Sequence, residues 1–373
     1  MRVLKIFQHA LYKKLLPRPA VRRNAGETRR SAVKNVIVFG RHPNPTADYY
    51  FTARFADRPD VGYQLADIRR ESFTDINAEG ALVILCRYVS SSAMRWIRRN
   101  EDQLAGVVLF LDDDIPAVIL GRDAPLPYRF FLYYRGLYHL KQLNRYLDAV
   151  WVSTQRLGES LGGVKFVIVP PAPPPQLWNV KKTSGVPAGE VLIAYHATSV
   201  HYSEHRFLQP IIAKVLQERP HARFEVFADR RAGKIWSRMD RVTVRSPVSW
   251  AEYLAESTNR PVDIMLVPLC PSHVNACRSP TKRIDVARFG AAAVFSLSEA
   301  YGKNEDGDEI LLPHDPRLWT EAVIDLIDNA DLRKNVADAT RARVASMAEE
   351  ACDLSGLKIG ITKTIPQLNR NGV

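Results

Sequence analysis

A run of prolines divides this chain into two series of short apolar segments. Five of the six residues from 170 to 175 are proline, which excludes regular structure there and makes the connection stiff. Apolar runs alternate with longer amphipathic segments on both sides of it, at residues 35–39, 81–85, 106–111, 148–152 and 166–169, and then at 191–195, 223–227, 242–244, 263–267 and 292–296. Such runs are typical of buried parallel strands joined by helices. The sequence therefore predicts an α/β fold built from two similar halves.

The length supports two domains, because 373 residues are more than one ordinary hydrophobic core contains. We expect an N-terminal domain over residues 35–175 and a C-terminal domain over residues 176–350, with an extension over 1–34 and a tail over 351–373. Ligands of open α/β sheets bind beyond the carboxyl ends of the strands. The crevice between the two halves is therefore the expected functional site.

Basic residues are concentrated at the N-terminus. Residues 1–34 contain ten Lys or Arg and one acid, Glu27, and so carry +9 of the net charge of +12. Apolar spacing over residues 3–11 predicts a small cationic amphipathic helix, and the Pro/Arg-rich stretch over 17–34 is not expected to pack. This charge could attach the protein to an anionic membrane surface; a solvated extension or an arm packed on the body is the alternative. We do not expect nucleic-acid binding, because no recognised module accompanies the charge.

The remaining composition favours the cytoplasm, with the inner face of the membrane as an alternative location. No apolar run approaches the ~20 residues that cross a bilayer, and charged residues interrupt the N-terminus before a signal-peptide core could form. The four cysteines form no CxxC pair. Cys270, His273 and Cys277 are close enough in sequence to share a metal, but no fourth ligand lies nearby. Ordinary thiols and no bound metal are therefore expected.

Residues 275–302 hold the motif with the clearest chemistry. A short amphipathic helix is expected there, followed by a glycine and a buried strand. The start of this helix carries four polar or basic residues, Arg278, Ser279, Thr281 and Lys282. Asp285 follows one turn later. Free backbone N–H groups, the positive end of the helix dipole and cationic side chains suit a diphosphate, and a carboxylate can accept hydrogen bonds from sugar hydroxyls. The segment predicts a clamp for a nucleotide sugar.

The second half opens with a loop of small hydroxylated residues. The apolar run at 191–195 is followed by Thr198 and Ser199, then by His201 and by a helix expected from about Glu204 to Pro220. Small residues let the backbone approach a ligand phosphate, so Thr198, Ser199 and His201 are candidate donor-binding residues. A simple helix cap is the alternative for the two hydroxyls.

Three acids follow the apolar run at 106–111. Asp112 and Asp114 have the spacing of a metal-binding DxD pair, since carboxylates at a strand end can hold Mg²⁺ or Mn²⁺. Asp114 could instead act as a base or hydroxyl binder on the acceptor side, or cap the next helix. His42, after the first apolar run, lies where the acceptor crevice should open and is a second catalytic candidate. Residues 128–147 interleave aromatic and basic residues, and their edge could rest on a membrane.

Several segments together resemble a known family. Three of them, IAYHATSVHYSEHRFLQPIIAKVLQERP (193–220), WAEYLAESTNRPVDIMLVPL (250–269) and NACRSPTKRIDVARFGAAAVFS (275–296), resemble the C-terminal domain of the retaining family-4 glycosyltransferases. DAVWVSTQRLGESL (148–161) resembles the end of the acceptor domain of that family. The resemblance covers roughly residues 106–345. It implies the GT-B architecture, in which two Rossmann-like α/β domains face each other across a cleft.

The resemblance also implies roles for single residues. Asp285 corresponds to the last acid of the family's paired-glutamate motif and would hold the donor ribose. Arg278 and Lys282 fall where the diphosphate is neutralised. Cys277 stands eight residues before Asp285, where the first glutamate is expected.

The activity that the resemblance implies is metal-independent sugar transfer. The donor would be a nucleotide-diphosphate sugar and the acceptor a lipid-linked bacterial surface glycan, with no further cofactor. Two alternatives are a non-catalytic relative that binds nucleotide or glycan, and a GT-A transferase whose metal is held by Asp112 and Asp114.

Overall fold

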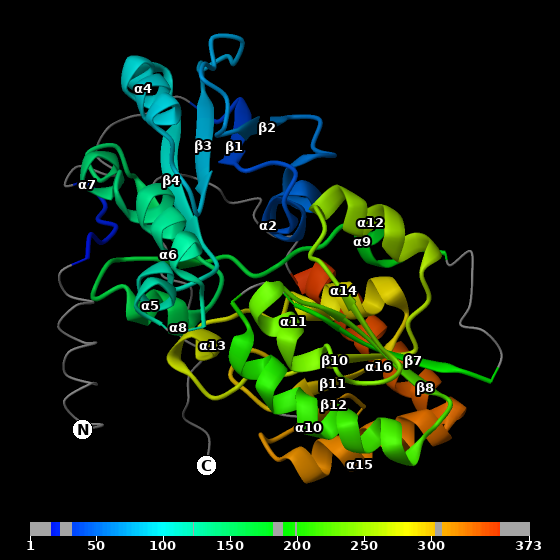
Figure 1. Ribbon diagram of the computed structural model, residues 1–373. Helices are drawn as coiled ribbons and strands as arrows, with labels where there is room; N and C mark the ends of the chain where they lie inside the picture. Colours follow the sequence, from blue (N-terminus) through cyan, green and yellow to red (C-terminus); the bar gives the residue numbers. More distant parts are fainter. Residues whose placement is uncertain are drawn as a thin grey trace, which may run out of the picture.

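The computed structural model describes residues 16–22, 32–121, 123–181, 189–197, 200–302 and 308–350 (Figure 1). The N-terminal helix expected over residues 3–11 and the tail over 351–373 lie outside these residues. Among the described residues, no helix combines the length and the apolar character that crossing a bilayer requires.

The first half contains a six-stranded parallel sheet. Its strands are β1 (Asn35–Gly40), β2 (Gly62–Asp67), β3 (Ala81–Cys86), β4 (Gly106–Leu111), β5 (Ala149–Val152) and β6 (Val167–Ile168). Their order across the sheet is β2-β1-β3-β4-β5-β6. Alternate residues of β3 belong to two different hydrophobic clusters, Val83 and Leu85 to one and Leu82 and Ile84 to the other. The sheet is therefore packed on both faces, which explains why its central strands are continuous apolar runs.

Helical segments connect the strands of this half. They are α2 (Pro45–Ala47), a π-helical turn (Asp48–Thr52), α3 (Ala53–Phe55), α4 (Ser91–Arg99), a 3₁₀ turn (Glu101–Gln103), α5 (Ile115–Leu120), α6 (Leu126–Leu132), a second π-helical turn (Tyr133–Leu137), α7 (Leu140–Leu143), α8 (Gln155–Ser160) and α9 (Pro175–Trp178).

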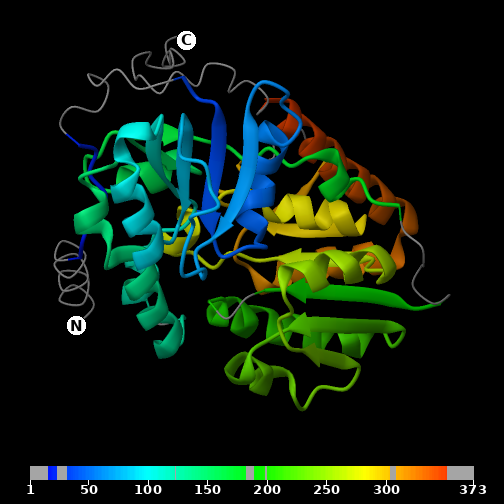
Figure 2. The same ribbon diagram turned by 90° about the horizontal axis from the view of Figure 1, so that it is seen from above.

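The second half contains another six-stranded parallel sheet. Its strands are β7 (Val191–His196), β8 (Ala222–Phe227), β9 (Val242–Arg245), β10 (Ile264–Val267), β11 (Ala292–Ser296) and β12 (Ile310–Leu312), in the order β12-β11-β10-β7-β8-β9. Its helices are α10 (Tyr202–Glu218), α11 (Arg230–Trp236), α12 (Trp250–Asn259), α13 (His273–Ala276), α14 (Lys282–Phe289), α15 (Pro316–Asp328) and α16 (Ala330–Glu350). The two sheets lie in separate parts of the molecule (Figure 2).

The predicted α/β fold with two halves is confirmed, and all ten predicted strands are present within one or two residues. The structure adds β2 and β12. Strand β2 lies at an edge of its sheet and is largely exposed, so its sequence GYQLAD carries no apolar run that could have revealed it. Strand β12 has three residues, too few for a pattern.

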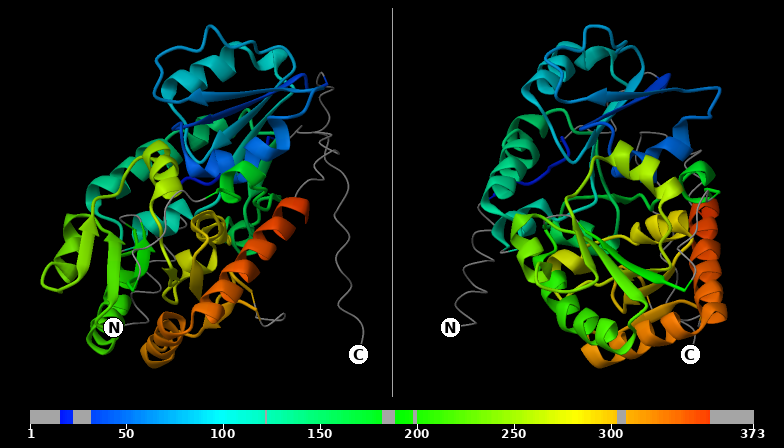
Figure 3. Two further views of the ribbon diagram at one scale, coloured as in Figure 1. Left: turned by 90° about the vertical axis from the view of Figure 1, so that its right-hand side faces the viewer. Right: turned by 45° about the vertical axis from the view of Figure 1, so that its right-hand side comes forward.

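The last helix joins the two halves. Figure 3 shows α16, coloured orange to red, running along the second half toward the first. Its residues Val344 and Met347 belong to the same hydrophobic cluster as Val36 and Phe110 of the first sheet. Residues Ile284 and Ala287 of α14 belong to this cluster as well. Helix α14 and the first half therefore share a core.

Part of the N-terminal extension packs on the first half. The side chain of Arg22 donates a hydrogen bond to the buried Asp148 carboxylate at 2.8 Å, and Asn144 bonds the backbone of Ala20 and of Arg18 at 3.0 and 2.9 Å. The expectation that the whole stretch from residue 17 remains unpacked is therefore wrong for residues 17–22. Apolar contacts of Leu16 and Val21 with the first core give the physical reason.

Candidate functional site

Residues that follow β4 meet residues that follow β10 at the boundary between the halves. The carboxylate of Asp114, Oδ2, accepts a hydrogen bond from His273 Nε2 at 2.8 Å. Asp113 Oδ1 lies 3.6 Å from Arg278 Nη1. Both sets of residues lie beyond the carboxyl ends of parallel strands, which is where ligands of such sheets bind. The candidate site therefore spans both halves.

Helix α14 begins later than the motif suggested. Thr281 is its N-cap residue, Lys282 is its first residue, and Gly290 ends it with a φ of 61°, a left-handed conformation that glycine adopts readily. Arg278 and Ser279 lie in the link between α13 and α14 rather than on the helix. The expectation that they form part of the helix start is wrong, because Pro280 and the preceding turn of α13 delay the helix.

Asp285 is buried, and both of its carboxylate oxygens are engaged. Tyr49 Oη, from the first half, donates to Oδ1 at 2.5 Å, and Lys282 Nζ donates to Oδ2 at 2.7 Å. Next to them, Ser279 Oγ and Tyr50 Oη lie 2.5 Å apart. The role of Asp285 toward a ribose stays a prediction. Sequence reasoning missed Tyr49 and Tyr50, since nothing in their own segment indicates contact with residues more than 220 positions away.

The loop after β7 leads to a buried acid that the sequence analysis did not single out. Thr198 and Ser199 lie outside the described residues. The ring of His201 is buried, which lowers its pKa, and the charge of Arg278 acts in the same direction. Glu204 accepts hydrogen bonds from Asn275 Nδ2 at 2.7 Å and from the Cys270 backbone at 3.1 Å. Burial opposes ionisation of Glu204, but His201 and Asn275 outweigh it and lower its pKa to about 2.

Three buried polar atoms near this loop have no hydrogen-bond partner among the described residues. They are Tyr195 Oη at the end of β7, His201 Nδ1, and Glu204 Oε2 in the first turn of α10, and the last two lie 3.6 Å from each other, which is within ion-pair distance. Arg278 interacts electrostatically with Tyr195 and with His201. Buried polar groups are nearly always hydrogen-bonded, so the Tyr195 hydroxyl in particular indicates the binding of a polar ligand or of water.

Of the three acids after β4, Asp112 and Asp113 share a partner, Arg87, whereas Asp114 has partners of its own. Asp112 pairs with Arg87 Nε at 2.8 Å and accepts a hydrogen bond from Thr46 at 3.0 Å. Burial and the neighbouring Asp113 raise the pKa of Asp112, although Arg87 opposes this. Asp114 Oδ1 accepts from the Ala117 backbone at 3.0 Å and so caps α5.

The GT-A alternative, with a metal between Asp112 and Asp114, is wrong for this chain. The fold is that of two parallel sheets, and Asp112 and Asp114 are engaged by different partners. Within the described ranges, the group of side chains with the spacing of metal ligands contains Asp114 but does not contain Asp112.

His42 has both ring nitrogens engaged close to its own position. Nε2 lies 2.9 Å from the Val38 carbonyl oxygen, and Nδ1 lies 3.1 Å from Asn44 Nδ2. Burial lowers the pKa of His42 and keeps the ring neutral at pH 7. This geometry fits a ring that holds the loop after β1, and the catalytic role of His42 stays a prediction.

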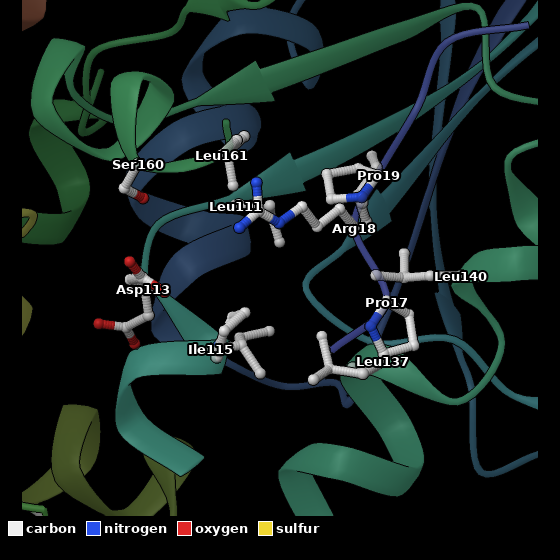
Figure 4. A pocket seen from close by; sticks show the side chains of 14 residues that line it. Pro17, Arg18, Pro19, Leu111, Asp113, Ile115, Leu137, Leu140, Ser160 and Leu161 are labelled. Atoms are coloured by element: carbon white, nitrogen blue, oxygen red, sulfur yellow. The ribbon is translucent and has the colours of Figure 1, made fainter. Parts of the chain in front are cut away.

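A recess lies beside the acids, between the packed N-terminal segment and the first half. Figure 4 shows Pro17, Arg18 and Pro19 on one side, with Leu137 beside Pro17, and Leu111 and Ile115 on the side toward Asp113. Most of its lining is apolar, and Asp114 also borders it. The recess places apolar surface next to Asp113 and Asp114.

Comparison with known proteins gives matches of fold. A scan of protein-family models and a search of curated proteins find no match. The crystal structure of HepE from Anabaena, in complex with UDP and glucose, matches with a TM-score of 0.55 and 11% identity, over 87% of this chain and 100% of that one. An E. coli trehalose-6-phosphate structure bound with UDP-2-fluoro glucose matches with a TM-score of 0.53 and 10% identity, over 88% and 100%.

A third match covers a smaller part of the matched protein. TarM from S. aureus, in a structure that contains UDP, matches with a TM-score of 0.46 and 8% identity over 74% of this chain. The present chain spans 55% of the length of that protein. At these identities it is the fold that the comparisons establish, through HepE and the E. coli structure. The chain has the GT-B fold, in which two parallel α/β sheets with their helices meet at a shared boundary.

Proposed function

We propose that the protein transfers a sugar from a nucleotide-diphosphate donor to a glycan acceptor. The observation that carries this proposal is the group of polar side chains beyond β7 and β10, where Arg278 acts electrostatically on Tyr195 and His201 and the buried Tyr195 hydroxyl has no hydrogen-bond partner among the described residues. Two structures with the same fold contain UDP or a UDP-sugar analogue, which agrees with a nucleotide sugar as the donor.

The cations supply the chemistry of the donor side. Arg278 and Lys282 would offset the negative charge that develops on the diphosphate as the sugar leaves. The diphosphate site would therefore need no metal ion. The backbone of the Thr198–Ser199 loop would approach a phosphate. Asp285 would bind the ribose after Tyr49 or Lys282 releases one of its oxygens.

The acceptor is proposed to bind on the side of the first half. Asp113, Asp114 and His42 are the candidate groups for its hydroxyls. Both oxygens of Asp114 already accept hydrogen bonds, which favours hydroxyl binding over the role of a free base.

Nucleotide binding tests the donor site. Calorimetric titration of the full chain with UDP, GDP and dTDP is expected to identify one preferred nucleotide. Lys282→Ala and Arg278→Ala should each weaken its binding by about tenfold, which corresponds to ~1.4 kcal/mol. Lys214→Ala is a matched control, because Lys214 is an exposed lysine of α10 whose ion pair with Glu218 lies within its own helix. Equal affinity in the Lys282, Arg278 and control variants would rule out this donor site.

A non-catalytic GT-B protein is the second candidate. Cys277 stands where the family's first acid is expected and is fully buried, and Asp285 is engaged on both oxygens. Incubation with a panel of nucleotide sugars and membrane-derived acceptors separates the two candidates. Transfer without added Mg²⁺ or Mn²⁺ supports the metal-free enzyme, whereas nucleotide binding with no transfer or hydrolysis supports the non-catalytic protein.

A lipid-linked surface glycan is the proposed acceptor class, with peripheral attachment to an anionic membrane. The supporting surface, here called the aromatic stripe, consists of Leu126, Phe130, Tyr134 and Tyr138, which recur every four residues along α6 and the turn after it. Leu126 and Phe130 are each 73% exposed. Aromatic and aliphatic side chains beside basic ones are typical of surfaces that lie in a membrane interface. The charge of residues 1–34 would add to this attachment.

A further inference from the structure

Three side chains of different chemistry converge at the boundary between the halves. Asp114 comes from the link between β4 and α5, whereas His273 and Cys277 lie four residues apart at the two ends of α13, on one face of the helical turn. A carboxylate oxygen of Asp114, a ring nitrogen of His273 and the sulfur of Cys277 all lie within 4.8 Å of one another. His273 Nε2 is 2.8 Å from Asp114 Oδ2 and 3.7 Å from Cys277 Sγ.

The geometry does not fit a nucleophile activated by a histidine and an acid. In such a relay the two ring nitrogens contact different partners, one the nucleophile and the other the acid. Here the sulfur and the carboxylate both face Nε2 of His273. One proton on this nitrogen can be donated to only one of them. A cation placed among the three atoms would be bound by all of them.

The spacing fits a zinc ion. With Zn–S bonds of about 2.3 Å and Zn–N and Zn–O bonds of about 2.0–2.1 Å, neighbouring ligand atoms of a tetrahedral site lie about 3.3–3.6 Å apart. The 3.7 Å from His273 Nε2 to Cys277 Sγ is close to this range, whereas the 2.8 Å to Asp114 Oδ2 is a hydrogen-bond distance that must lengthen when the ion binds. A thiolate, an imidazole and one carboxylate are ligands typical of Zn²⁺ rather than of Mg²⁺ or Ca²⁺.

The surroundings hold two ligands firmly and leave the third accessible. Asp114 and Cys277 are buried, whereas the side chain of His273 is 42% exposed. Asp114 Oδ1 is fixed by the Ala117 backbone, and Thr154 Oγ1 donates to the Cys277 carbonyl at 2.9 Å. The Ala117 contact orients the Asp114 carboxylate, and the Thr154 contact fixes the backbone of Cys277, whose Sγ also lies 3.9 Å from the Arg156 carbonyl oxygen. Three protein ligands with one exposed side leave a fourth position for water or for a hydroxyl.

We propose that Asp114, His273 and Cys277 bind one Zn²⁺ ion that fastens the two halves together. On binding, the Cys277 thiol releases its proton to solvent, neutral His273 coordinates through Nε2, and Asp114 coordinates as the carboxylate. The ion replaces the direct hydrogen bond between His273 and Asp114. This inference does not depend on the proposed function, and it concerns a position other than the diphosphate site. It shares Asp114 with the proposed acceptor side, and with the ion bound Asp113 and His42 would be the remaining candidates for the acceptor hydroxyls.

Cobalt titration of the full chain tests the proposal. The protein is first freed of metal by dialysis against a chelator, and Co²⁺ is then used as the probe, because a thiolate ligand gives a charge-transfer absorption band with this ion. We expect one Co²⁺ per chain, with the thiolate band present and displaced by Zn²⁺. Cys277→Ser should abolish the band. Cys270→Ser is the matched control and should retain it, because Cys270 is a partly buried cysteine that is not in the ligand group.

Two further variants separate loss of a ligand from loss of folding. His273→Ala removes an exposed side chain and should weaken Zn²⁺ binding at least tenfold without unfolding the protein. Asp114→Asn retains a residue that caps α5 well and should weaken binding similarly. Absence of a thiolate band in the wild type, or a band that persists in Cys277→Ser, would overturn the proposal, as would unchanged Zn²⁺ affinity in His273→Ala.

Discussion

Tyr49 and Asp285 are 236 positions apart in the chain, and the Tyr49 hydroxyl donates a 2.5 Å hydrogen bond to the Asp285 carboxylate across the boundary between the halves. Both residues are buried, and burial together with the negative charge of Asp285 raises the pKa of Tyr49 well above its usual range. Tyr49 therefore remains a donor at every physiological pH. The carboxylate of Asp285 on α14 is therefore held in place by a residue of the first half.

Removal of this hydroxyl should weaken the contact between the halves. Tyr49→Phe leaves one oxygen of the buried Asp285 without its donor, so we expect a loss of about 1–3 kcal/mol in the free energy of unfolding, measured by urea denaturation. Tyr63→Phe is the control, because the Tyr63 hydroxyl lies 3.4 Å from Thr52 within the first half. Similar losses in the two variants would contradict a special role for Tyr49.

Acid should destabilise the second half through His205. Burial lowers the pKa of His205 from 6.5 to about 4, and its Nδ1 accepts a 3.0 Å hydrogen bond from Trp236 that a proton on that nitrogen would break. Because the unfolded chain binds this proton more readily, the contribution is fully present above pH 6.5 and is lost as the pH falls toward 4. The wild type should lose about 3 kcal/mol more than His205→Gln between pH 7 and pH 4. Denaturant titrations at several pH values measure this, and parallel profiles for the two proteins would refute it.

The packed N-terminal segment should contribute to stability through Arg22. Arg22→Ala removes the partner of the buried Asp148, whose other oxygen accepts a hydrogen bond from the Val107 backbone at 2.8 Å. We expect a loss of about 1–3 kcal/mol in the free energy of unfolding. Arg58→Ala provides the comparison, since the ion pair of Arg58 with Asp60 lies on the surface and should contribute less than ~1 kcal/mol. If both variants unfold at the same urea concentration, the segment does not stabilise the fold.

The aromatic stripe should determine binding to membranes together with residues 1–34. Phe130→Glu should lower the fraction of protein that sediments with anionic vesicles by at least tenfold, because it places a charge on an apolar surface. Leu65→Glu is the control, since Leu65 is 40% exposed on strand β2, away from the stripe. Deletion of residues 1–34 should also release the protein, but that deletion removes the packed segment as well, so the point variant is the sharper test. Unchanged partition of Phe130→Glu would exclude the stripe as a membrane contact.

The amino-acid sequence by itself determined the fold class and most of its strands. Central strands such as β3 and β4 are covered on both faces of the sheet, so their residues are continuously apolar. Such a run is recognisable in the amino-acid sequence alone. The edge strand β2 is half exposed and has no such signature. The motif over residues 275–302 is recognisable for a similar reason, because its basic residues, acid and glycine follow one another within one segment, and its role toward a donor stays a prediction.

Only the tertiary structure decided which residues meet at the site. In the sequence, His273 and Cys277 lie near Cys270, the third candidate metal ligand. The fold instead places Asp114, from the first half, beside His273 and Cys277. It likewise brings Tyr49 to Asp285 and Glu204 to Asn275. A helix or strand imposes a regular spacing of apolar residues on its own segment of the sequence. Contacts between distant segments impose no such spacing. They arise when two sheets pack through a shared core, and no local pattern records which side chains then face each other.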